Sequence, residues 1–219
     1  MSLESGILRS LMLLGACGAV SPIPAAAQKK EDIPSFPFGT PVVVLPVQSA
    51  LPRPNGEWPG GSADEAEVLE ALNAELTFAF GERRAAADWA SPGMVVRRAK
   101  RNPLLGIDPE RVAYQGLIKP IEGQLYEPLH GQLRALAALF GARFVVLPLA
   151  VWDRPGEPEE ETGAGPRPRR RAVLLVAMID IRSSRVLWHG EIEGGAAPPD
   201  SPALLGTLAD RVARALAPS

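Results

Sequence analysis

Residues 41–47 read PVVVLPV, a continuous apolar run bounded by prolines. A strand with one face in water alternates apolar and polar side chains, whereas a strand covered on both faces is apolar throughout. Residues 143–151, RFVVLPLAV, repeat this pattern much later in the chain. The two runs therefore predict two strands in a sheet that carries other elements on both of its faces.

Three amphipathic helices are predicted around these strands. Ser62 and Glu65 have the S-x-x-E spacing of a capping box, and the helix that they open would end at Gly81. A second helix follows Leu125 and ends at Gly141, and a third starts at residues 200–202, DSP. The apolar residues recur at steps of three and four; they are Val68, Leu69, Leu72, Leu76 and Phe80 in the first helix, Leu129, Leu133, Leu136, Leu139 and Phe140 in the second, and Leu204, Leu205, Leu208, Val212 and Leu216 in the third.

The remaining segments predict a hairpin, a weak strand and a long loop. Residues 172–181 and 186–193 are apolar runs separated by four residues, which is a hairpin length. Residues 94–96, MVV, are interpreted as a short strand, and residues 108–111, DPER, as the start of a helix. Residues 153–171 contain no large apolar side chain and predict an exposed low-complexity loop.

These elements define the expected fold class. Strands that alternate with helices favour parallel pairing, and the late hairpin adds antiparallel pairing. We therefore expect an α/β fold, leaning toward α+β, in a single three-layer-like domain over residues 40–217. Its mixed β-sheet of about five strands would be covered by three main helices.

The N-terminus carries a targeting signal. Residues 10–20, SLMLLGACGAV, are apolar, and small residues at 25–27 precede Gln28, which is the pattern of a secretory signal peptide over residues 1–27. Residues 28–39 would form a flexible lead-in. In an alternative interpretation, residues 14–17 (LGAC) form a lipobox and Cys17 is lipidated. The expected location is periplasmic or secreted, or an outer-membrane lipoprotein if Cys17 is used.

Composition excludes several classes of function. The formal net charge is -2, so no bulk field favours nucleic acid as a partner. One cysteine and two histidines are too few for a disulfide framework or a structural zinc site. Neither a phosphate-binding P-loop nor a dinucleotide-binding glycine motif follows any predicted strand. We expect no metal and no cofactor.

The order of these motifs resembles a known family. The first strand and helix, then residues 141–147 (GARFVVL), 176–180 (VAMID) and 185–191 (RVLWHGE), look like the α/β domain of the TolB N-terminus and of CsgG-like and LpoB-like envelope proteins. Arg143 stands where an acidic residue is common, and Ser183 and Ser184 replace a Thr-Gly turn. The resemblance implies a domain of the periplasm or outer membrane that makes protein contacts.

Catalysis is disfavoured by the residues available. His130 and His189 are the only imidazoles, G-x-S-x-G is absent, and the serines lie in turn or cap contexts. We therefore expect a non-enzymatic scaffold or adaptor that binds an envelope protein. The alternatives are an exported small-ligand or lipid-binding protein and, less favoured, a secreted hydrolase.

One basic cluster is the candidate binding site. Arg97, Arg98, Lys100 and Arg101 would form a cationic edge after the short strand at 94–96, facing either lipid phosphates or an acidic protein. A peripheral membrane contact is therefore also expected as an alternative to a protein partner.

Overall fold

The computed structural model describes residues 33, 36, 39–83, 88–118, 124–157 and 168–216. These residues belong to one compact unit, Ile33–Ser219. The predicted signal peptide, Cys17 and most of the predicted lead-in lie outside the described residues.

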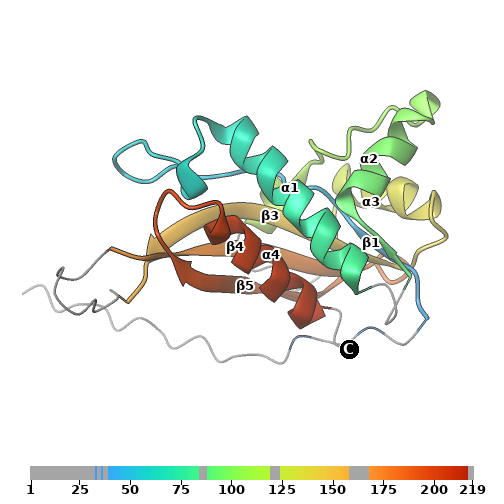
Figure 1. Cartoon of the computed structure of the whole chain (residues 1–219). Helices are drawn as coiled ribbons and strands as arrows, with labels where there is room; N and C mark the ends of the chain where they lie inside the picture. Colours follow the sequence, from blue (N-terminus) through green and yellow to red (C-terminus); the bar gives the residue numbers. More distant parts are fainter. Residues whose placement is uncertain are drawn as a thin grey trace, which may run out of the picture. The chain divides into compact units, whose positions relative to one another are not determined.

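A mixed five-stranded sheet forms the middle layer of this unit (Figure 1). The strands are β1 (Val42–Val44), β2 (Trp89–Ala90), β3 (Phe144–Pro155), β4 (Arg170–Asp180) and β5 (Arg185–Ala197). Their order is β2-β1-β3-β4-β5; β1 pairs in parallel with β2 and β3, and the β3–β4 and β4–β5 pairs are antiparallel. The prediction of one mixed sheet with a late hairpin is confirmed.

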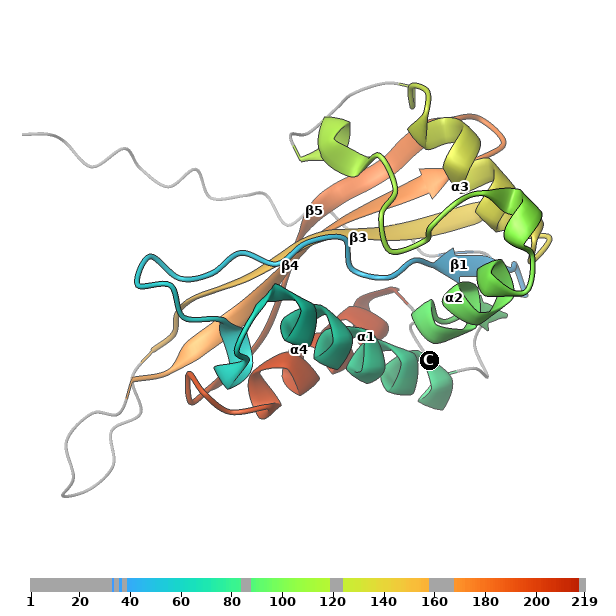
Figure 2. The same cartoon turned by 90° about the horizontal axis from the view of Figure 1, so that it is seen from above.

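Helices cover both faces of the sheet. One core contains residues of α1 (Glu65–Glu82) and α4 (Ala203–Leu216), and the other contains residues of α2 (Pro92–Lys100) and α3 (Leu129–Ala138). Figure 2 shows α1 and α4 together on one side of the sheet and α3 on the other. Short 3-10 turns occur at η1 (Pro59–Gly61), η2 (Pro103–Leu105) and η3 (Tyr114–Leu117).

The apolar run of β1 explains why both faces are covered. Val42 and Val44 lie in the core with α1 and α4, while Val43 lies in the core with α2 and α3, and all three are fully buried. Successive side chains of a strand point to opposite faces, so a buried middle strand has no position for a polar residue. The prediction of a strand buried on both faces is confirmed.

Two local predictions are wrong. Residues 94–96 belong to helix α2, because Pro92 occupies its first turn and Val95 donates its N–H to the Ser91 carbonyl at 3.1 Å; the weak strand is the preceding β2. Residues 108–111 form a turn. There the buried Gln48 side chain bonds the carbonyl of Pro109 and the N–H of Val112, at 3.0 Å each, so neither group is available to a helix.

The start of α1 is also shifted from the predicted capping box. The N-cap is Asp64, whose carboxylate accepts the N–H of Glu67 at 2.9 Å. Glu67 in turn accepts the N–H of Ala63 at 2.6 Å. The reciprocal cap therefore lies two residues beyond the predicted Ser62–Glu65 pair, and Glu65 instead accepts the N–H of Ala50 at 3.0 Å.

The predicted loop at 153–171 is shorter than expected at both ends. β3 continues to Pro155 and β4 begins at Arg170, while residues 158–167 lie outside the described residues. The Asp153 side chain is 1% exposed and accepts hydrogen bonds from Arg53, whose Nε and Nη2 lie 2.9 and 2.8 Å from Oδ2. The Nε atom of Arg170 lies 3.0 Å from the same oxygen. Asp153 is thus part of the folded body.

Arg143, the unusual residue of the second strand motif, has a partner in β4. Its Nε and Nη2 donate to the two carboxylate oxygens of Asp180 at 3.1 and 2.6 Å, and the Asp180 side chain is 5% exposed. The hydrogen bond from Arg143, with further bonds from Ser183 and from the N–H of Arg182, lowers the pKa of Asp180 to about 2.

This pair predicts a pH-dependent contribution to stability. Because the pKa of Asp180 is lower in the folded chain than in the unfolded one, its contribution is complete above about pH 5 and is lost as the pH falls from about 4 toward 2. We expect Asp180→Asn to lower the free energy of unfolding by about 1–3 kcal/mol at pH 7, and by progressively less below pH 4. Urea denaturation of both proteins between pH 7 and pH 3 measures this difference; a difference that does not change with pH would contradict the prediction.

Candidate functional site

The predicted basic cluster lies on helix α2 and at its C-terminal end. Pro92, Val95 and Ala99 are buried, at steps of three and four, and they fix which side of the helix faces the core. The remaining face carries exposed Arg97, Arg98, Lys100 and Arg101, which we call the α2 surface. Cations at a helix C-terminus also interact favourably with the helix dipole. The cluster is therefore a helix face and not the strand edge that the sequence predicts.

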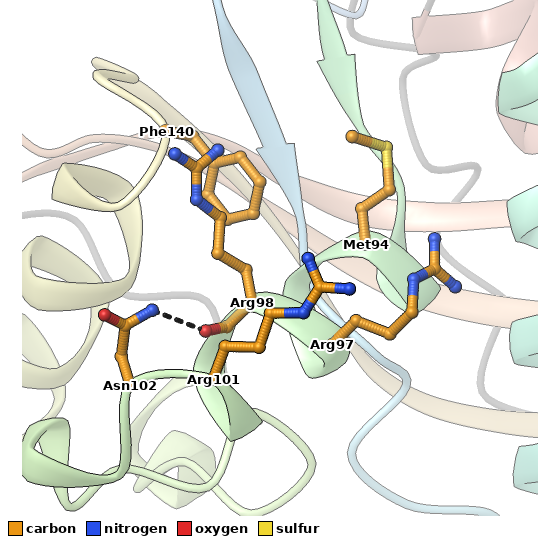
Figure 3. Close-up of a pocket in the computed structure, with 6 residues that line it drawn as sticks. All are labelled: Met94, Arg97, Arg98, Arg101, Asn102 and Phe140. Carbon is orange, nitrogen blue, oxygen red and sulfur yellow. Dashed lines mark hydrogen bonds between the residues drawn. The ribbon is translucent and has the colours of Figure 1, made fainter.

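A hollow of about 440 Å³ lies within the α2 surface (Figure 3). The Arg98 guanidinium lies over the Phe140 ring, 4.8 Å from its centroid, and Asn102 Nδ2 donates to the Arg98 carbonyl at 2.8 Å. The stacking of Arg98 on an aromatic ring restricts its side chain while leaving its charge in place. The lining residues are Met94, Arg97, Arg98, Arg101, Asn102 and Phe140.

The four cations of the α2 surface lack carboxylate partners among the described residues. No ion pair there involves any of them. Other arginines do have such partners; examples are Arg83 with Asp210 and Arg154 with Glu191. Four like charges within little more than one helical turn repel one another, so an anion placed among them would be stabilised.

Besides the lining residues Met94, Asn102 and Phe140, the structure adds Leu104 to this site, which the sequence pattern does not indicate. Leu104, in η2 directly after α2, is 102% exposed, more than any other large apolar side chain among the described residues. Its neighbour Leu105 packs against the core formed with α2 and α3, and Gly106 takes a left-handed conformation that ends the turn. The Asn102–Pro103 pair predicts a turn here, but no local pattern indicates which of Leu104 and Leu105 faces outward.

Both histidines make contacts that connect separate segments of the fold. His130 Nε2 lies 2.9 Å from Ser184 Oγ, and its Nδ1 lies 3.5 Å from a carboxylate oxygen of Glu127. Ser184 belongs to the turn between β4 and β5, where it has a φ of 55° and its carbonyl accepts the Leu125 N–H. Glu127 also accepts the N–H of Gly131 in the first turn of α3. These contacts join the hairpin turn to α3.

His189 lies on β5, and its Nε2 is 2.7 Å from the carbonyl oxygen of Leu117. This bond ties the hairpin to η3. A second hollow, of about 260 Å³, lies nearby and is lined mainly by apolar groups, including those of Leu117, Leu125, Leu129 and Val186. Small-molecule sites are mostly apolar, so a small ligand, the alternative predicted from sequence, would bind in this hollow.

The described residues contain no group of three or more histidine, cysteine, aspartate or glutamate side chains that could hold a metal ion. None of their helices is both long and apolar enough to cross a lipid bilayer.

The layers and the α2 surface together describe an α/β domain with helices on both faces of its sheet and a cationic helix face. No family model matches the chain, and no curated protein does. Solved structures with some similarity include the LpoB C-terminal domain from Salmonella enterica, at 14% identity over 74% of this chain and 85% of that chain, with a TM-score of 0.35. The PelC dodecamer from Paraburkholderia phytofirmans is 12% identical over 84% of this chain and 93% of that chain, with a TM-score of 0.37. The hypothetical protein CT253 from Chlamydia trachomatis is 15% identical over 80% of this chain and 92% of that chain, also with a TM-score of 0.37.

LpoB is among the families that the strand and hairpin motifs resemble. The TolB-like and CsgG-like assignments stay predictions from sequence.

Proposed function

We propose that this chain is an exported, non-enzymatic domain of the cell envelope that acts as a scaffold or adaptor, bringing a protein partner to an anionic surface. Export rests on the apolar run at 10–20 and the small residues at 25–27, with cleavage before Gln28 or, alternatively, lipidation at Cys17. The anionic contact is assigned to the α2 surface.

The observation that carries this proposal is the set of four cations of the α2 surface, none of which pairs with a carboxylate in the described part of the chain. The chain as a whole is slightly acidic, with a net charge of -2, so this positive surface is local. Each lysine or arginine close to an anionic surface contributes about 1 kcal/mol of attraction, which weakens over a Debye length of about 8–10 Å in physiological salt. Four together would give measurable association that salt reverses.

The test is binding of residues 28–219, which contain the whole described fold, to isolated cell-envelope preparations. We expect the variant Arg97→Glu/Arg98→Glu/Lys100→Glu/Arg101→Glu to bind at least about tenfold more weakly at low salt, with little change in thermal stability, because exposed charges contribute little to folding.

A matched variant controls for total charge. Arg134, Arg182, Arg185 and Arg211 are exposed and lie outside the α2 surface, so reversing these four to glutamate changes the net charge by the same amount. We expect this variant to keep its binding, as should His130→Gln/His189→Gln. Equal losses in the two charge-reversal variants, or loss on changing the histidines in a folded protein, would overturn the proposal.

A further inference from the structure

Leu104 is the most exposed large apolar side chain of the described residues, and it follows directly on the α2 surface. Asn102, two residues earlier, lines the hollow between the arginines. The turn is fixed at both ends: Asn102 donates its N–H to the Ala99 carbonyl at 2.9 Å, and Gly106 donates to the Pro103 carbonyl at 3.2 Å. Leu104 is therefore presented to solvent by an ordered turn.

Single exposed apolar side chains are common on protein surfaces and need no explanation by themselves. Leu104 differs because it follows three residues after Arg101, the last of four cations that have no carboxylate partner within the described ranges. A surface that combines lysine and arginine with a projecting apolar side chain has the composition of an interfacial membrane contact, in which the cations meet the headgroups and the apolar group enters the boundary of the acyl chains.

We propose that the α2 surface and Leu104 dock this domain on an anionic phospholipid bilayer. Arg97, Arg98 and Arg101 would hold a headgroup phosphate in the hollow, and Leu104 would insert beside it. This inference rests on the proposed function and specifies that the anionic surface is a phospholipid bilayer. An acidic protein would satisfy the cations equally well but would give no reason for the exposure of Leu104, and for this reason the bilayer is favoured.

The experiment measures binding of residues 28–219 to vesicles that contain no protein. We expect binding to phosphatidylcholine vesicles with about 30% phosphatidylglycerol and none to phosphatidylcholine alone. Leu104→Ser should weaken binding about tenfold, because the apolar burial is lost, and the four-glutamate variant of the α2 surface should abolish it. Phe78→Ser is the matched control; Phe78 is 68% exposed on α1 and its change should leave binding unaltered.

Insertion of the side chain at position 104 into the bilayer is measured by tryptophan fluorescence. Leu104→Trp should shift its emission to shorter wavelength when anionic vesicles are added, whereas Phe78→Trp should not.

The outcomes separate this inference from the proposed function. If the α2 charges are needed for binding to envelope preparations, but protein-free vesicles are not bound and Leu104→Ser has no effect, the bilayer inference is wrong and an acidic protein is the partner. If charge reversal leaves envelope binding intact, the proposed function fails as well. A tryptophan at 104 that stays in water while the protein is bound to vesicles would also overturn the inference.

Discussion

Asp153→Asn is expected to lower the free energy of unfolding by about 2–4 kcal/mol, a shift in the midpoint of thermal unfolding of roughly 5–15 °C. The side chains of Asp153 and Arg53 are 1% and 5% exposed, and two donor atoms of Arg53 lie within 3 Å of the carboxylate. Removing the carboxylate charge leaves the buried Arg53 guanidinium without its main counter-charge. The resulting loss of stability is larger than the net stabilisation that the intact ion pair provides.

The same arginine provides the control. Glu57 also pairs with Arg53, at 2.8 Å, but its side chain is 61% exposed, so Glu57→Gln should cost far less than Asp153→Asn. Calorimetry or urea unfolding of the two variants gives the comparison. Equal effects would show that burial of the Asp153 carboxylate does not set the strength of this contact.

Gly194→Ala is the second change with a large expected effect, because α4 packs against β5 at this residue. A Cβ at Gly194 would lie 2.8 Å from the backbone nitrogen of Leu208 and 2.9 Å from its Cα. Backbone atoms of a helix cannot move aside as a side chain can, so α4 would have to shift away from the sheet. We expect a loss of about 2–4 kcal/mol in the free energy of unfolding.

Gly195 is the matched control in the same strand. A Cβ there would have Thr207 Cβ as its nearest neighbour, at 3.4 Å, which is an ordinary contact. Gly195→Ala should therefore change stability by less than about 1 kcal/mol, since alanine suits a strand better than glycine does. If the two variants unfold alike, close packing of α4 on β5 is not what requires glycine at 194.

The elements that could be predicted from the sequence are those whose pattern is local and repeated. The apolar run of β1, the spacing of Leu204, Leu208 and Val212 in α4, and the short turn between β4 and β5 each carry their signal within one segment. These predictions are confirmed, and they are enough to define the mixed sheet with helices on both faces.

The failures have two causes, a partner distant in sequence in one case and a helix start signal close in sequence in the other. Asp153 looks like the first residue of a polar loop, but Arg53, a hundred positions earlier, pairs with it and keeps it in β3. Residues 94–96 have strand-like side chains, yet Pro92 and the buried positions Val95 and Ala99 favour a helix.

Only the charged part of the candidate site could be predicted from the sequence. The cations at 97, 98, 100 and 101 are evident in the sequence because they are consecutive or nearly so. The position of Phe140 under Arg98 and the exposure of Leu104 depend on how α2, α3 and η2 pack, and no local pattern reports this.

Export of the chain and its retention at an anionic envelope surface by the α2 surface can be measured together in cells. Cells that express the full chain in a Cys17→Ser background, so that no lipid on Cys17 can act as the anchor, are fractionated, and the N-terminus of the protein is determined by mass spectrometry. We expect an exported protein that begins at Gln28, is found with membranes at low salt and is released by high salt or by the four-glutamate variant of the α2 surface. A chain that keeps Met1 and stays in the cytoplasm would show that it is not exported, and membrane association that survives charge reversal would show that the α2 surface does not hold it there.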